Sequence, residues 1–178
     1  MAPSTILQHP DARLRTPCAP VTAFDADLAR LVEDLLDTLE AAGGIGLSAP
    51  QVGDLRRVSV TDLAGDRGAA EVFVNPEIVA RRRWAIVEES CLSVPGVVGN
   101  VLRATRVRVR AVDPAGEPFE RELEDMRAVC LQHELDHLNG KLFIERLSPI
   151  RRLRLRLANA RARRRAGAAD PDAGRRPA

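Results

Sequence analysis

The chain has 178 residues, of which 45% are hydrophobic and 29% are charged, and its formal net charge is +2. This length and apolar content predict one domain with a single core and a tail. No run of 18 apolar residues occurs, which excludes a transmembrane helix. The start of the chain lacks the pattern of a secretion signal, and three cysteines make no disulfide framework, so we expect a cytoplasmic protein.

The first predicted element is an amphipathic helix. Asp25 suits its N-cap, leucine and valine recur at helical spacing, and Gly43 ends the helix after about Ala42. Residues 45–53 are punctuated by Gly and Pro and predict irregular, extended backbone. The extended segments expected next are residues 57–61, 72–74 and 84–87.

The second half predicts more strands and then a second helix. Residues 97–101 and 107–112 are expected as two strands, and residues 119–123 pair back after a turn. Asp125 is expected to cap a helix that Asn139-Gly140 stops. On one face of this helix lie Met126, Val129, Cys130, His133 and His137.

A third helix is expected from Ser148, which suits the cap, to about Arg165. From Arg146 onward eleven arginines stand against two aspartates, a balance of +9, whereas the rest has 16 basic and 23 acidic residues, a balance of −7. This basic helix indicates either a polyanionic partner or a solvated face. The side that should meet an apolar surface carries Ile150, Leu153, Leu157 and Ala160.

The fold class predicted from these elements is α+β. We expect mainly antiparallel, short-stranded sheets around a central helix, together with an N-terminal helix and a basic C-terminal helix. The division is a domain at residues 1–147, the basic helix at residues 148–166 and a disordered tail at residues 167–178, which has few large apolar residues.

His133-Glu134-Leu135-Asp136-His137 is the most informative segment of the chain. Two histidines four residues apart lie on one helix face, where a single divalent metal can bind both. Glu134 can reach a metal-activated water as general base. A catalytic site needs a third protein ligand, and the sequence offers Glu145 downstream or Cys91 upstream.

Three ordered motifs show which family the chain resembles. Three segments are similar to the three signature motifs of the peptide deformylases: Gly44-Ile45-Gly46-Leu47-Ser48-Ala49-Pro50-Gln51, Glu89-Ser90-Cys91-Leu92-Ser93 and His133-Glu134-Leu135-Asp136-His137. The similarity extends from about Ile6 to Arg152. The resemblance implies a metallo-amidohydrolase of linear amides that releases formate from the N-formyl-methionine of nascent chains.

The resemblance also implies a role for each motif residue. Cys91, His133 and His137 would bind the metal, and Glu134 would be general base and then general acid. Gln51 and the backbone N–H of Leu92 would donate to the oxyanion. Glu89 and Arg103 would support the site as an ion pair. The substrate, with its methionine side chain, would lie against Gly44, Ile45, Gly46, Met126, Val129 and Cys130.

Three positions depart from the family pattern. Ser90 replaces a glycine beside the ligand cysteine, Ser48 stands where alanine is common, and Val98 occupies a position where some members have an arginine. Ser90 and Val98 put the affinity for substrate in doubt. None of the three removes a metal ligand or Glu134.

Two other functions and several metals stay open. A zinc endopeptidase would use Glu145 in place of Cys91 and would keep its metal in a Cys91→Ser variant. A non-catalytic RNA-binding protein would not need Glu134, but the chain has no tyrosine and no aromatic-rich strand for reading RNA. Two imidazoles and a thiolate suit Zn²⁺, whereas the resemblance favours Fe²⁺ in the cell, with Ni²⁺ or Co²⁺ as substitutes. The expected partners are nascent formyl-methionine peptides and, through the basic helix, the ribosome.

Overall fold

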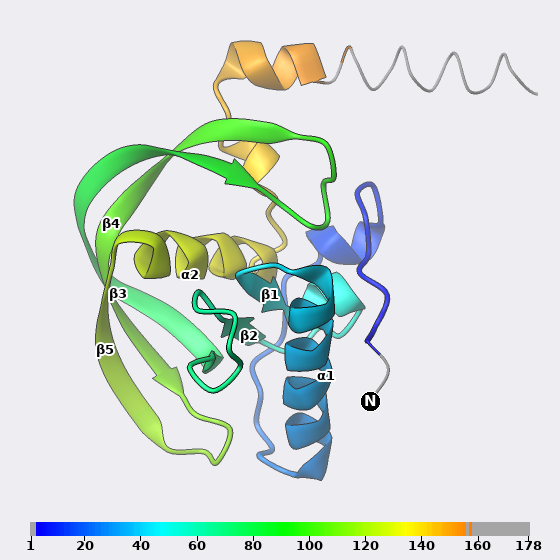
Figure 1. Ribbon diagram of the computed structural model, residues 1–178, viewed down its shortest axis with the longest axis vertical. Helices are drawn as coiled ribbons and strands as arrows, with labels where there is room; N and C mark the ends of the chain where they lie inside the picture. Colours follow the sequence, from blue (N-terminus) through cyan, green and yellow to red (C-terminus); the bar gives the residue numbers. More distant parts are fainter. Residues whose placement is uncertain (1–2, 156, 158–178) are drawn as a thin grey trace, which may run out of the picture.

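A single antiparallel sheet organises the computed structural model, which describes residues 3–155 and 157 (Figure 1). Its five strands lie side by side in chain order. They are β1 (Gly46–Ser48), β2 (Val58–Thr61), β3 (Glu71–Ser90), β4 (Val98–Val112) and β5 (Pro118–Glu124). The predicted α+β class and the antiparallel sheet are confirmed.

Two strands are much longer than the short strands predicted from sequence. Residues 72–74 and 84–87 belong to one strand of 20 residues, β3. Residues 98–101 and 107–112 belong to the 15-residue β4, whereas residue 97, the expected start of the first of these strands, lies before it. The prediction was wrong because Asn75-Pro76 resembles a strand end. Here Asn75 has a φ of 52°, and the register shifts between Val74 and Glu77, so that a bulge carries the strand past the proline.

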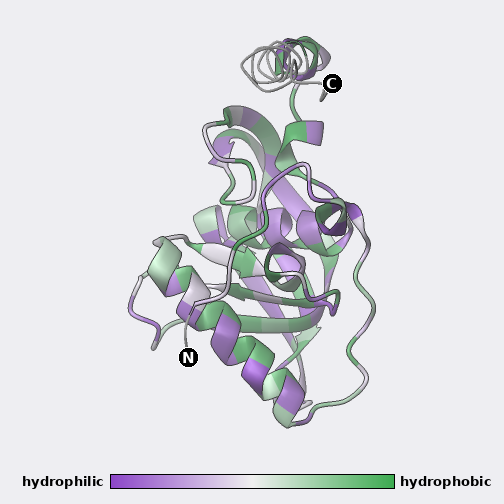
Figure 2. Cartoon of the chain, turned by 90° about the vertical axis from the view of Figure 1, so that its right-hand side faces the viewer, coloured by the Kyte–Doolittle hydropathy of each residue, from purple (hydrophilic) through white to green (hydrophobic). Residues whose placement is uncertain are grey.

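Helix α1 (Ala26–Ala42) has the boundaries that its capping residues predict. The Asp25 carboxylate accepts hydrogen bonds from the backbone N–H groups of Asp27 and Leu28 at 3.0 and 3.1 Å. Gly43 ends the helix at a φ of 62°, which suits glycine. Polar and apolar residues are interspersed along α1 (Figure 2), and its apolar side packs on β1 and β2.

Helix α2 (Asp125–Leu138) lies at the centre of the molecule, and β3 and β4 curve around one side of it (Figure 1). The helix packs on β4 and also on β1 and β2, which buries ten of its 14 residues. Its N-cap is Glu124, one residue before the expected Asp125. Three short 3₁₀ turns are also present: η1 (Ala12–Arg15), η2 (Ala49–Val52) and η3 (Phe143–Glu145).

The C-terminal segment is helical at residues 149–155 and 157. The Arg152 N–H donates to the Ser148 carbonyl at 2.9 Å, near the expected start. Ile150, Leu153 and Leu157 are between 52% and 68% exposed, so within the described residues this stripe does not make the expected apolar contact. Leu155 packs on the body instead. The rest of the helix prediction and the predicted tail at residues 167–178 lie outside the described residues. No described helix is long and apolar enough to cross a membrane.

Candidate metal centre and active site

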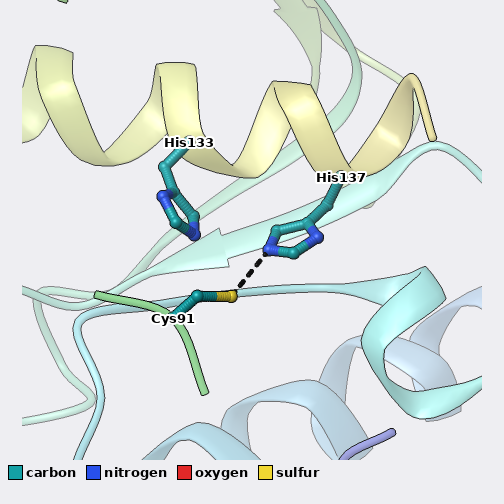
Figure 3. Close-up of side chains that lie close together, drawn as sticks. All are labelled: Cys91, His133 and His137. Atoms are coloured by element: carbon teal, nitrogen blue, oxygen red, sulfur yellow. Dashed lines mark hydrogen bonds between the residues drawn. The ribbon is translucent and has the colours of Figure 1, made fainter. Parts of the chain in front are cut away.

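Three side chains that can ligate a metal meet at the centre of the molecule. His133 and His137 extend from α2 toward Cys91, which follows the end of β3 (Figure 3). One ligand atom from each lies within 4.8 Å of the others, and the Cys91 Sγ is 3.2 Å from the His137 Nε2. The structure therefore brings together the two histidines and the upstream cysteine, residues from distant parts of the chain.

The two imidazoles are held in place by their neighbours. One helical turn separates them, so that their ring centroids are 5.1 Å apart in an edge-on arrangement. Phe143 stacks on the His133 ring at 6.0 Å. The His133 Nδ1 lies 2.9 Å from a Glu89 carboxylate oxygen, which leaves the Nε2 for a metal, as in many metal sites.

The surroundings of the two histidines favour a positive charge on His133 and oppose one on His137. Burial opposes a charge on His133, but hydrogen bonds to Cys91 and Glu89 raise its pKa to about 10. Burial and the neighbouring His133 charge lower the pKa of His137 well below its usual value. Its buried Nδ1 also has no hydrogen-bond partner among the described residues. Two imidazoles and a thiolate form a donor set suited to a divalent metal with an open position.

A buried network of ion pairs supports the metal centre from behind. Arg103 is 2% exposed and donates from Nε and Nη2 to the two Glu89 carboxylate oxygens, at 2.6 and 3.0 Å. Burial opposes the charge on Glu89, yet Arg103 and His133 lower its pKa to about 2. The predicted partnership of Glu89 and Arg103 thus exists as a bidentate pair.

The same arginine has a second partner that sequence reasoning missed. The Arg103 Nη1 donates to the Asp136 carboxylate at 2.7 Å, and Arg146 donates to that carboxylate as well. Asp136 lies inside the His-Glu-Leu-Asp-His motif but points away from the ligand face. The only signal in the sequence is the place of this charged residue between Leu135 and Leu138, which are both buried.

Glu134 is buried beside the candidate metal centre, and burial raises its pKa. The Ser48 hydroxyl is within hydrogen-bond distance of the Glu134 Oε2 at 2.5 Å and of its carbonyl at 3.1 Å. In the sequence Ser48 is only a departure from the family pattern, whereas in the structure its hydroxyl contacts the candidate base. A Cβ at Gly46 would lie 2.5 Å from the Glu134 Oε1, so close approach to Glu134 requires glycine there.

Gln51 turns its side-chain N–H groups toward the metal ligands. Its Oε1 accepts a hydrogen bond from the Ser48 N–H at 2.9 Å, which fixes the orientation of the amide. The Nε2 then donates to the Ser93 hydroxyl at 3.1 Å and to the Cys91 Sγ at 4.0 Å. The amide donor predicted from the first motif is therefore adjacent to the Cys91 sulfur.

A cavity of about 570 Å³ opens beside the metal ligands. It is lined by every residue expected to contact substrate and by the expected catalytic residues: Gly44, Ile45, Gly46, Gln51, Leu92, Met126, Val129, Cys130 and Glu134. Ser90 also lines it, whereas Val98 lies at a separate hollow beside Leu147. Glu145 does not join the ligand group, because its carboxylate is bound by Arg15 and by the Leu142 N–H.

This arrangement defines a class of protein. A metal-dependent hydrolase is built from such parts: two histidines one turn apart, a cysteine opposite them and a buried glutamate at the wall of an apolar cavity. The alternative built on Glu145 lacks the geometry for a third ligand.

Comparison with known proteins narrows the class to one family. The family model described as Polypeptide deformylase matches residues 3–153. A peptide deformylase of Chromobacterium violaceum is 48% identical over 88% of this chain and 93% of its own length, and one of Alkalilimnicola ehrlichii is 51% identical over 88% of each chain. The chain belongs to the polypeptide deformylase family.

Solved structures agree with this assignment. The crystal structure of a peptide deformylase from Legionella pneumophila covers 96% of this chain with a TM-score of 0.85 at 46% identity. That of Thermotoga maritima covers 84% with a TM-score of 0.79 at 37% identity. The chain is an enzyme, a hydrolase that removes the N-formyl group from nascent peptides.

Proposed function

We propose that deformylation takes place at Cys91, His133 and His137, with these side chains as the ligands of a divalent metal. The observation that carries the proposal is the meeting of three ligand atoms within 4.8 Å beside the buried Glu134. A divalent metal in such an open site polarises a carbonyl and makes water a nucleophile at neutral pH.

The remaining steps belong to residues of the chain. The Glu134 carboxylate accepts a proton from the attacking water and passes it to the nitrogen of the departing amine. The Gln51 Nε2 and the Leu92 backbone N–H donate to the oxygen that gains negative charge as the formyl carbon becomes tetrahedral. Ser48 and Gly46 hold the Glu134 carboxylate at the cavity wall, through a hydrogen bond and through close packing.

Formate release from formyl-methionine peptides, measured beside metal analysis of anaerobically purified protein, tests this proposal. We expect about one metal per chain, and we expect Cys91→Ser to lose both metal and formate release. A Cys91→Ser protein with full metal content would contradict the ligand set.

The apolar part of the cavity is proposed to hold the methionine side chain. Val129, which is 3% exposed, lines the cavity beside Cys130 and Met126. We expect Val129→Phe to raise the KM of formyl-Met peptides about ten-fold and the KM of formyl-Ala peptides less. The phenylalanine ring would fill space that the methionine side chain of the substrate needs and that the smaller alanine side chain does not. Steady-state kinetics with both peptides decides, and an equal effect on both would place Val129 outside the side-chain pocket.

The metal in the cell is proposed to be Fe²⁺, since a thiolate and two imidazoles accept iron as well as zinc. A ferrous ion beside the Cys91 thiolate is open to oxidation in air. We expect the activity of iron-loaded protein to decay in air, with oxidised Cys91 detected by mass spectrometry, and Ni²⁺ or Co²⁺ to protect it. Equal air stability of the iron and nickel forms would argue against this assignment.

The segment after residue 147 is proposed to bind the ribosome in the cytoplasm, outside a catalytic domain at residues 1–147. Residues 150, 153 and 157 are exposed in the described part of the chain, and the arginines of this segment favour an RNA surface. We expect deletion of residues 149–178 to leave kcat on short formyl-Met peptides unchanged and to weaken ribosome binding. Equal co-sedimentation of both proteins with ribosomes at low salt would contradict this role.

A further inference from the structure

A basic run in the middle of β3 has no part in the deformylase site. Arg81, Arg82 and Arg83 precede Trp84, and all four residues are exposed. Arginines of the same sheet at positions 106, 108 and 110 pair with glutamates of β5. Among the described residues, by contrast, residues 81–83 form no ion pair, so their charge is uncompensated.

Arg81 and Trp84 border a hollow of about 610 Å³. Gln132 and Asp136 line it from one face of α2, and Asn139 lines it from the C-cap of that helix. Val129 and His133 line the deformylase cavity from another face. The hollow is therefore a separate site. Two of its cations, Arg103 and Arg146, are already paired with Glu89 and Asp136. The charged residues that remain in the lining are Arg57, Arg81 and Lys141 against Glu77, a balance of +2.

The cations of this hollow are placed for an anion. Arg57 donates to the Asn139 Oδ1 at 3.0 Å and to the carbonyls of Pro76 and Leu138 at 3.2 and 3.4 Å. These acceptors are uncharged, so Arg57 is fixed in position and keeps its full charge. Lys141 has no carboxylate partner in the described part of the chain, and Asp136 is already neutralised by two arginines.

An exposed aromatic ring stands beside these cations. Trp84 is 57% exposed, and Leu102, which is equally exposed, lines the hollow with it. A site for single-stranded nucleic acid combines cations that bind phosphates with a flat ring on which a base can stack. This face has both. We propose that this face binds single-stranded RNA, with phosphates on Arg57, Arg81 and Lys141 and one base on Trp84.

A membrane surface is the competing partner for exposed tryptophan and arginine. A bilayer is flat and meets protruding side chains, whereas Arg57 and Lys141 line a hollow that a flexible phosphate backbone can enter. The geometry therefore favours RNA, and lipid binding becomes an outcome of the test.

The experiment uses the fluorescence of Trp84, which is the only tryptophan in the chain. Full-length protein is titrated with a 12-residue oligouridylate while binding is followed in parallel by anisotropy of labelled RNA. Stacking on Trp84 should quench its emission to saturation, and added salt should reverse the quenching. Saturated anisotropy with unchanged tryptophan emission would place RNA elsewhere on the protein, such as the basic C-terminal segment, and overturn the proposal.

Two double variants test the cations. Arg81→Ala with Lys141→Ala should raise the RNA concentration for half-maximal quenching about ten-fold and lower the salt slope by about 1.4, the value for two phosphates of a single strand. Formate release should be unchanged. Arg108→Ala with Arg110→Ala removes the same charge elsewhere on the sheet and should have less than a two-fold effect.

Two results would overturn the proposal at this stage. If both double variants weakened RNA binding equally, the binding would be a diffuse attraction between charges and not binding at a defined site. A blue shift of Trp84 emission with vesicles of phosphatidylglycerol, at lower concentration than any quenching by RNA, would assign the face to lipid.

Discussion

Replacing Glu134 by glutamine is expected to abolish most of the hydrolysis while the protein stays folded. The amide keeps the shape of the side chain but cannot take a proton from water, so kcat should fall by on the order of 10²–10⁴-fold, the usual scale of general acid–base catalysis. The buried side chain still accepts the Ser48 hydrogen bond through its amide oxygen. Formate release and metal content of the same preparation measure the effect.

Glu145→Gln is the matched control, since Glu145 carries the competing endopeptidase mechanism. Its carboxylate is bound by Arg15 at the surface and lies outside the ligand group. The Glu145→Gln control should keep its metal content and its rate of formate release. Near-normal formate release from Glu134→Gln would remove Glu134 from the mechanism, and metal loss in Glu145→Gln would revive the alternative ligand set.

Replacing Arg103 by leucine is expected to give the largest loss of stability. The change leaves Glu89 and Asp136 buried without their shared cation, and removing one partner of a buried ion pair costs about 3–5 kcal/mol in free energy of unfolding. Urea unfolding of the metal-free proteins measures this. Glu89 also orients His133, so metal affinity should fall by roughly 10–100-fold.

Arg108→Leu on the same strand provides the comparison. Its pair with Glu120 is 3.3 Å long and half exposed, so a loss below about 1 kcal/mol is expected. Similar losses for the two variants would mean that the buried network does not stabilise the fold.

Local signals account for the parts of the structure that were predicted well. Asp25 and Gly43 delimit α1 because capping depends on neighbouring residues alone. The spacing of His133 and His137 places both on one side of a helix by geometry. Cys91 could be selected over Glu145 only through the resemblance to a family, since no local rule connects a cysteine to a helix 40 residues away.

Tertiary contacts account for the rest. The continuity of β3 through Asn75-Pro76 depends on its pairing with β4, which no short window of sequence contains. Asp136 of α2 can be buried because Arg103 reaches it from β4, whereas its charge alone predicts an exposed side chain. The hydroxyl of Ser48 contacts the carboxylate of Glu134, which lies 86 residues further along the chain, so no local pattern predicts this contact.

The strand order of the sheet has a consequence for how the chain folds. Each strand pairs with the strand next to it in the chain, so the sheet can grow hairpin by hairpin at low cost in loop-closure entropy. The docking of α2 on β1 and β2 joins segments about 80 residues apart. We expect this step to come late, so that an intermediate has a sheet but no active site. Metal bound at Cys91, His133 and His137 should then slow unfolding and leave the folding rate almost unchanged.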